Sequence, residues 1–259
     1  MGTDRCAYVS RLRNVDPIPK LFFSLTALLV CLFCDSIAVG LFTLALMGVL
    51  TVVLGGQKPG VLLRFLRIPL AFLVIGCLTI VLRPLAVEED ALWSFFLGRF
   101  RWGITSLSLH MGAMVFCKAM GTISAMYFLS MNTPMTDLTM ALERLHIPRL
   151  LIELMELIYR FIFVLGDTAG RIRTAQESRL GYQGLRRSLE SLGTLASMVF
   201  LRALRRGDRV YAALESRGYT GSLFTLPGEY DPGRWLYAAA AAAAAGQLLV
   251  LFAERRFFP

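Results

Sequence analysis

One long apolar run near the N-terminus limits what this chain can fold into. Residues 21–54 are almost entirely apolar, and Asp35, near the centre, is the one charged residue among them. As a single helix the run would measure about 51 Å, whereas the hydrocarbon core of a bilayer is about 30 Å thick. It would also hold the Asp35 carboxylate in lipid, which is energetically costly. We therefore expect two short membrane-spanning helices with a tight turn at residues 34–36.

Composition extends this conclusion to the whole chain. Of its 259 residues, 56% are hydrophobic and only 17% are charged, and the mean hydropathy is +0.61. The alternating pattern of barrel strands is absent, so helices are the structure that can satisfy the backbone in lipid. We predict an all-α membrane protein with about five transmembrane helices. The net charge of +9 lies beside and between the apolar runs, which favours membrane lipid over nucleic acid as a partner.

Three further apolar runs complete the predicted spans, at residues 68–82, 104–131 and 235–252. Arg64 and Arg67 should precede the first of these, and residues 83–102 read as a mixed-charge loop whose aromatic side chains suit a membrane interface. Residues 1–131 are thus an N-terminal transmembrane region with four spans. Residues 222–259 are a C-terminal loop and the last span, where eight consecutive alanines allow close helix approach.

The segment between them, residues 132–221, is predicted to be a cytoplasmic module of long amphipathic helices. Thr133-Pro134 is a helix start, Ile147-Pro148 separates this helix from the next, and the next helix would be about 46 Å long if it continues to Arg179. A last helix over residues 188–217 has one apolar face. Its other face carries four arginines, Arg202, Arg205, Arg206 and Arg209.

Basic residues also predict the topology. They lie at the N-terminus, around Lys58 and throughout residues 132–221, which places these parts in the cytoplasm. Five spans then put Arg255 and Arg256 outside, against the usual distribution of positive charge. We expect a multi-pass protein of the cell inner (cytoplasmic) membrane.

Few residues are candidates for chemistry. Cys31 and Cys34 form a C-x-x-C pair inside an apolar run, which favours helix packing over a metal or redox site. No Walker motif, acid pair or nucleophile constellation appears, so we expect no catalytic residue, no metal site and no cofactor. His110 and Lys118 are candidate intramembrane polar residues near one face of the fourth span.

Two short segments nearly repeat each other. Residues 175–182 read Ala-Gln-Glu-Ser-Arg-Leu-Gly-Tyr, and residues 213–219 read Ala-Leu-Glu-Ser-Arg-Gly-Tyr. Each ends a predicted cytoplasmic helix. A glycine stop and an arginine in the last turn explain either copy alone, but not the matching flanks. Two equivalent arginine-tipped helix ends indicate two equivalent pockets on a symmetric partner.

These segments resemble the transmembrane T component of energy-coupling factor (ECF) transporters, importers of vitamins and metal ions powered by a pair of ABC-type ATPases. In that family two motifs of the pattern small-Arg-small end two coupling helices, and each docks in one ATPase. The matching residues are Ser178, Arg179 and Leu180, and Ser216, Arg217 and Gly218, with Glu177 and Glu215 in support. Leu180 departs from the pattern, because a small residue is usual there.

Other parts of the chain share the resemblance. They are Thr133-Pro134, Ile147-Pro148, residues 159–161 (Tyr-Arg-Phe) and the opening from Ser10 to Lys20, which resembles the cobalt-type subgroup. The resemblance implies a non-catalytic subunit with two ATPase partners and a substrate-binding membrane subunit. Cobalt is the first expected substrate; nickel and a vitamin are the alternatives.

Two other classes remain open. A small membrane-embedded enzyme would use His110, Lys118 or the loop acids Glu88, Glu89 and Asp90, and it would be active as an isolated chain. A basic membrane-surface anchor would bind anionic lipid. The paired arginine segments favour the coupling subunit over both.

Overall fold

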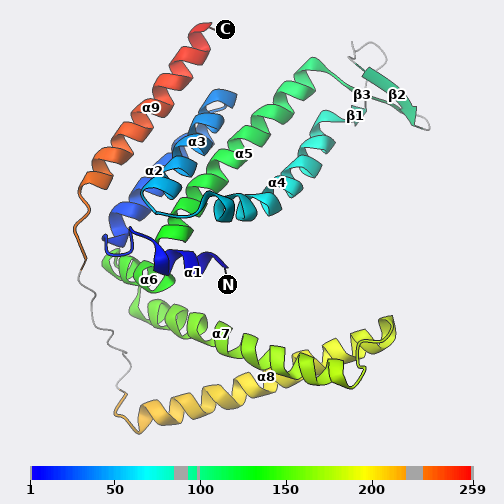
Figure 1. The fold of residues 1–259 in the computed structure, drawn as a ribbon, viewed down its shortest axis with the longest axis vertical. Coiled ribbons are helices and arrows are strands. Elements are labelled where there is room, and N and C mark those ends of the chain that lie inside the picture. The colour runs from blue at the N-terminus through cyan, green and yellow to red at the C-terminus, as the bar shows by residue number, and fades with distance from the viewer. Residues whose placement is uncertain (1, 85–92, 98–99, 220–229, 258–259) are drawn as a thin grey trace. The chain divides into compact units, whose positions relative to one another are not determined.

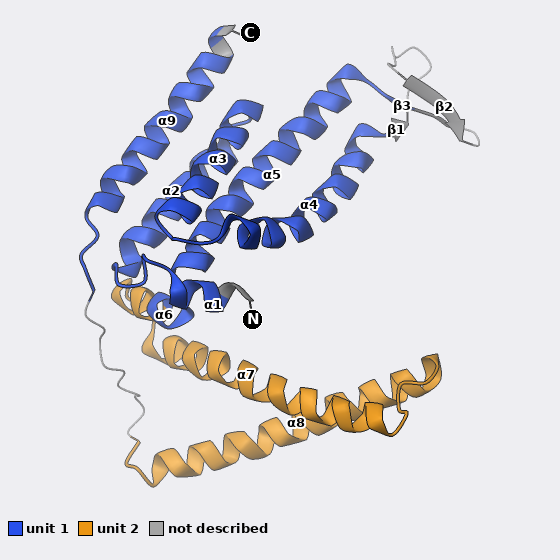
Figure 2. Cartoon of the chain, viewed as in Figure 1, with its two compact units in different colours: residues 1–138, 229–259 blue, residues 139–228 orange. Residues whose placement is uncertain are grey.

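The computed structural model of the chain describes residues 2–84, 93–97, 100–219 and 230–257. The chain forms two compact units (Figure 2). The first combines residues 1–138 with residues 229–259, and the second consists of residues 139–228. The two ends of the sequence therefore fold together in the first unit.

Helices make up most of the first unit (Figure 2). They are α2 (Pro17–Phe33), α3 (Ile37–Val53), α4 (Pro59–Val81), α5 (Ser106–Asn132) and α9 (Trp235–Phe257), and a short helix α1 (Gly2–Val9) precedes them. By length and composition α4, α5 and α9 can each cross a bilayer, whereas α2 and α3 are shorter, with 17 residues each. The predicted class, an all-α membrane protein, is confirmed.

The predicted turn between the first two apolar helices is also confirmed. Helix α2 ends at Phe33 and α3 begins at Ile37, so Asp35 lies outside both. The Ser36 hydroxyl accepts a hydrogen bond of 3.1 Å from the Val39 N–H and so caps α3. Ser36 thus starts a second helix within the apolar run, three residues after α2 ends at Phe33.

Helix α5 is the central helix of the first unit and packs against α2, α3 and α4. Glycines bring α3 and α5 close together. A Cβ atom on Gly40 would lie 2.6 Å from the backbone of Cys117, and one on Gly121 would lie 2.8 Å from the Gly40 carbonyl oxygen. No hydrophobic effect drives helices together in lipid. Small residues at such positions allow close van der Waals packing, which stabilises the contact between the two helices instead.

The alanine-rich helix α9 packs against α2 and α3. Ala240 and Ala243 are buried, which agrees with the predicted close approach. Gln247 is fully buried, and its amide donates to the Ala27 carbonyl at 3.1 Å and to the Thr43 hydroxyl at 2.7 Å. These hydrogen bonds fix the orientation of α9 about its own axis, which the small and identical alanine side chains do not define by packing alone.

The expectation of a loop over residues 83–102 was wrong. The structure has three short strands there, β1 (Arg83–Pro84), β2 (Trp93–Leu97) and β3 (Phe100–Ile104). They form an antiparallel sheet in the order β1-β3-β2. The physical reason is that the aromatic residues of this segment favour strands as strongly as they favour membrane interfaces.

The start of the third span was also placed too late. Helix α4 begins at Pro59, so Arg64 and Arg67 lie inside it instead of before it. Both Leu62 and Leu66 are buried, and this i, i+4 pair gives the first turns of α4 an apolar face. The two arginines lie on the exposed side of the same turns.

Three helices follow α5. Helix α6 (Met135–Arg144) crosses the boundary between the units, and α7 (Arg149–Ser178) and α8 (Leu185–Glu215) belong to the second unit. The predicted start after Thr133-Pro134 and the predicted break at Ile147-Pro148 are both confirmed, since α6 begins and α7 begins directly after those prolines.

The second unit buries little of its own surface. Helices α7 and α8 contact each other, are joined by residues 179–184, and diverge toward their other ends (Figure 1). In α7 only Ile152 and Glu153 are buried, and α8 has no buried residue within the described chain. Large apolar side chains such as Leu150 and Phe200 are about two-thirds exposed, at 67% and 66%. Such surface in a long helix pair is typical of a unit that binds partners.

Candidate functional site

The first of the two repeated segments forms the end of α7. The helix stops at Ser178, and Arg179 is the capping residue. Leu180 has a positive φ of 58°, in the left-handed region, and the Gly181 N–H donates to the Gln176 carbonyl at 2.9 Å. A left-handed residue followed by this six-residue hydrogen bond is a Schellman helix end.

The second segment forms the end of α8 in the same way. Helix α8 stops at Glu215, and Arg217 is followed by Gly218 with a positive φ of 76°. The Tyr219 N–H donates to the Leu214 carbonyl at 3.0 Å, which closes the same six-residue hydrogen bond.

The two helix ends therefore match residue by residue. Each arginine directly precedes the left-handed residue, so Leu180 takes the place that Gly218 has at the other end. Each preceding serine, Ser178 and Ser216, donates from its hydroxyl to the carbonyl three residues earlier at 3.0 Å. We call these two ends, residues 178–180 and 216–218, the arginine tips.

The strain at the first tip has a local explanation. A leucine in the left-handed region costs about 1–2 kcal/mol more than a glycine. Gly181 cannot exchange places with it easily, because a Cβ atom at Gly181 would lie 2.8 Å from the Ser191 hydroxyl and 2.9 Å from the Gln176 carbonyl. Glycine is thus required one position later, where the chain passes close to α8.

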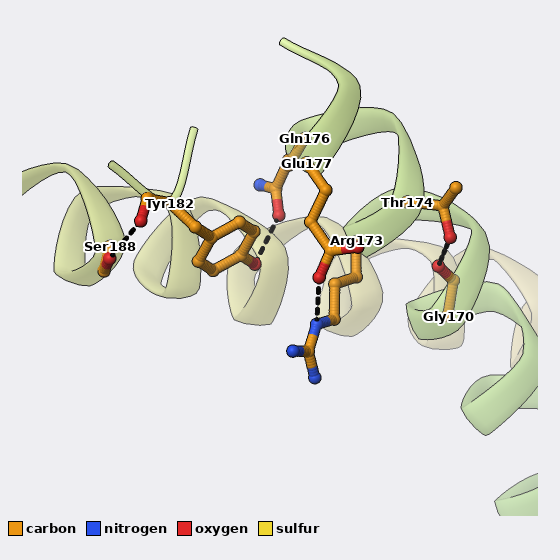
Figure 3. Close-up of polar contacts among 7 residues, drawn as sticks. All are labelled: Gly170, Arg173, Thr174, Gln176, Glu177, Tyr182 and Ser188. Carbon is orange, nitrogen blue, oxygen red and sulfur yellow. Dashed lines mark hydrogen bonds and ion pairs between the residues drawn. The ribbon is translucent and has the colours of Figure 1, made fainter. Parts of the chain in front are cut away.

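Side chains next to the first tip hold this turn in place (Figure 3). The Tyr182 hydroxyl donates to the Gln176 side chain at 2.8 Å, and the Gln176 amide donates to the Ser191 carbonyl at 2.9 Å. The Ser191 hydroxyl in turn donates to the Gly181 carbonyl at 2.7 Å. These bonds tie the end of α7 to the first turns of α8.

A tyrosine also anchors the second tip. The Tyr219 hydroxyl donates to the Glu153 carboxylate at 3.2 Å, and Glu153 is buried. Burial and this hydrogen bond raise the pKa of Tyr219 above its usual value. The sequence had indicated these anchors only through the Gly-Tyr pair that follows each arginine.

The arginines themselves form no such contact among the described residues. Both Arg179 and Arg217 are exposed, and neither takes part in an ion pair among the described residues. Glu177, a predicted supporting residue, pairs with Arg173 on its own helix at 2.8 Å (Figure 3). Arg179 also lines a groove of about 460 Å³ between the end of α7 and the start of α8. The tips thus present two guanidinium groups on rigid turns.

The intramembrane candidates His110 and Lys118 are not brought together. Lys118 donates to the Asp35 carboxylate at 2.7 Å, so the charged residue of the α2–α3 turn is its partner. His110 is exposed and precedes Lys118 by eight residues, which is about 12 Å along the axis of α5. The loop acids Glu88, Glu89 and Asp90 lie outside the described residues.

Comparison with known proteins decides the family. The model of the family described as CbiQ, cobalt transport protein, matches residues 9–226, a range that includes both arginine tips. The chain belongs to the CbiQ cobalt transport protein family. As a CbiQ-family member it is a membrane transport component.

Individual relatives agree with this assignment. The chain is 32% identical to the cobalt transport protein CbiQ of Salmonella typhimurium, over 85% of this chain and 97% of that protein. It is 33% identical to a putative fused cobalt transport protein CbiMQ of Methanocorpusculum labreanum, over 87% of this chain and 37% of the fused protein. It is 27% identical to the energy-coupling factor transporter transmembrane protein EcfT of Lacticaseibacillus paracasei, over 65% of this chain. The CbiQ family member is thus related to the T components of ECF transporters, as the arginine segments had suggested.

Proposed function

We propose that the chain is the transmembrane coupling (T) subunit of an ECF-type ABC importer. In this role it transmits the ATP-driven motion of two ATPase subunits to a separate substrate-binding membrane subunit, and it catalyses no reaction itself. The observation that carries the proposal is the pair of matching arginine tips.

The geometry of the tips supports two separate docking contacts. They lie at the ends of α7 and α8, and α8, which begins just after the first tip, has 31 residues and so measures about 46 Å. One small pocket cannot receive both tips at once. Two copies of the same ATPase can, because each copy offers an identical pocket to an identical helix end.

The chemistry of the tips suits a carboxylate in each pocket. The Schellman bonds already satisfy the Gln176 and Leu214 carbonyls within the tips, so a partner does not have to supply donors for them. The planar guanidinium remains available for a bidentate ion pair with Asp or Glu. The left-handed residue after each arginine gives the backbone the same path at both tips.

The long helices suit the transmission of motion. Movement of either tip acts on a continuous helix of 30 or 31 residues. The apolar side chains that α7 leaves exposed near its start, such as Leu150 and Leu154, suit contact with a membrane-embedded partner, and we assign this surface to the substrate-binding subunit.

Relatives support cobalt as the substrate, since the matching family and two of the relatives above are described as cobalt transport proteins. Nickel or a vitamin is the alternative, because the name of the EcfT relative specifies no substrate. In the proposed topology the N-terminus, the Lys58 loop and residues 132–221 face the cytoplasm of a cell whose inner membrane the chain crosses several times.

The test is ATP-driven uptake of radiolabelled cobalt by vesicles that contain this chain with its ATPases and membrane partner. We expect uptake that requires both ATP and this chain. Uptake of a vitamin without metal would overturn the substrate assignment. Activity of the lone chain, without any ATPase, would overturn the coupling role.

A further inference from the structure

Four arginines of α8 share one groove of the second unit. The groove has a volume of about 310 Å³, and Leu165 and Thr168 of α7 form its other wall. The arginines are Arg202, Arg205, Arg206 and Arg209. A volume of this size is that of a small-molecule pocket.

The spacing of the arginines makes the cluster repulsive. They follow the i, i+3, i+4, i+7 pattern, which places all four on one face of α8. Like charges at i, i+3 and i, i+4 destabilise a helix. None of the ion pairs found in the described part of the chain involves any of the four. An anion in the groove would relieve this repulsion.

Apolar groups adjoin the charges. Leu165 lines the groove itself, and the Arg206 guanidinium lies 5.9 Å from the centre of the Phe161 ring. Leu201, which precedes Arg205 by four residues and so lies beside it on α8, is 44% exposed. A basic cluster bordered by exposed apolar side chains is typical of helices that bind the membrane interface.

We propose that this four-arginine groove binds the phosphate headgroup of an anionic phospholipid, with the acyl chains along the neighbouring apolar side chains. Guanidinium forks match phosphate oxygens in a bidentate manner. A lipid needs an apolar wall for its acyl chains, whereas an acidic protein surface or a soluble anion does not need one. The site concerns lipid alone, so it stands independently of the ATPase-coupling role.

The test is a titration of the purified full chain in detergent with phosphatidylglycerol and, separately, with phosphatidylcholine, read by native mass spectrometry. A basic residue near an anionic lipid contributes about a fivefold change in affinity. We therefore expect R205Q/R209Q, which removes two such residues, to weaken phosphatidylglycerol binding by about 25-fold and to leave phosphatidylcholine binding unchanged. The charge-matched control R171Q/R186Q, whose arginines line neither groove, should match the parent chain.

Three results would overturn the proposal. One is equal phosphatidylglycerol affinity in both double variants. Another is displacement of phosphatidylglycerol by glycerol 1-phosphate at equal concentration, which would make the groove a soluble-phosphate site. The third is loss of bound ATPase from the R205Q/R209Q complex with lipid binding intact, which would make the groove a protein contact. Because α8 has no buried residue and R205Q/R209Q removes two like charges, the thermal unfolding midpoint of the variants should not fall below the parent value.

Discussion

Replacing both tip arginines should release the ATPase subunits without unfolding the chain. Arg179 and Arg217 are exposed, and the described residues hold no ion pair with either. Their removal from the lone chain should change its free energy of unfolding by less than about 0.5 kcal/mol, as for exposed substitutions generally. A loss of assembly in Arg179→Ala/Arg217→Ala therefore reports on docking and not on folding.

The size of the effect follows from the docking chemistry. Truncating one partner of an ion pair that docking shields from water costs about 2–5 kcal/mol, largely because the other charge is left buried. This corresponds to a loss of roughly 30-fold to several-thousand-fold in affinity at each tip. A single change leaves the other tip engaged, so it should impair transport, whereas the double change should abolish transport. Lysine should rescue poorly, because an ammonium group cannot form the bidentate pair.

The assay is affinity purification of the tagged chain, with retained ATPase and ATP-driven uptake measured in parallel. Arg171→Ala/Arg186→Ala is the matched control, since both arginines are exposed and the ion pair of Arg186 is with Glu190 of its own helix. That exposed pair contributes about 0.3–0.5 kcal/mol. If both double variants retain ATPase equally, the tips are ordinary basic surface and the coupling argument fails.

Three further predictions concern the fold. Gly218→Ala should destabilise the end of α8 by about 1–2 kcal/mol because φ is +76° there, although nothing lies within 4 Å of the added Cβ. Amide hydrogen exchange at Tyr219 should therefore accelerate, and an unchanged rate would contradict the left-handed cap. Gly40→Ala should lower the melting temperature in detergent, since overpacking of this kind costs about 1–3 kcal/mol; an unchanged value would contradict the close α3–α5 contact. Gln247→Ala should cost about 1–3 kcal/mol by removing its bonds to Ala27 and Thr43, and a chain as stable as the parent in the same melt would argue against this buried contact.

Local patterns in the sequence predicted the parts of the fold that depend on local energetics. Asp35 inside an apolar run predicted the α2–α3 turn, and Pro148 predicted the break before α7. Both features act within a few residues of the chain: Asp35 acts through the cost of holding its carboxylate in lipid, and Pro148 acts through the backbone. The strands β2 and β3 were missed because aromatic residues favour a strand and a membrane interface alike, and only the pairing of the two segments distinguishes them.

A repeated motif in the sequence predicted the candidate site, and the structure supplied its geometry. The repeated Glu-Ser-Arg segments indicated two helix ends, but Leu180 beside Gly181 left their alignment to be fixed by the backbone. The left-handed φ of Leu180 depends on a close approach to α8 that no local pattern encodes. The partnership of Lys118 with Asp35 is likewise a tertiary contact between residues far apart in the sequence.

The most direct test of the coupling role is the number of ATPase copies bound per chain, measured by native mass spectrometry on the complex purified from its membrane in mild detergent. We predict two copies with the parent chain and none with Arg179→Ala/Arg217→Ala. A complex that holds no ATPase, or one in which the double variant still carries two copies, would contradict it.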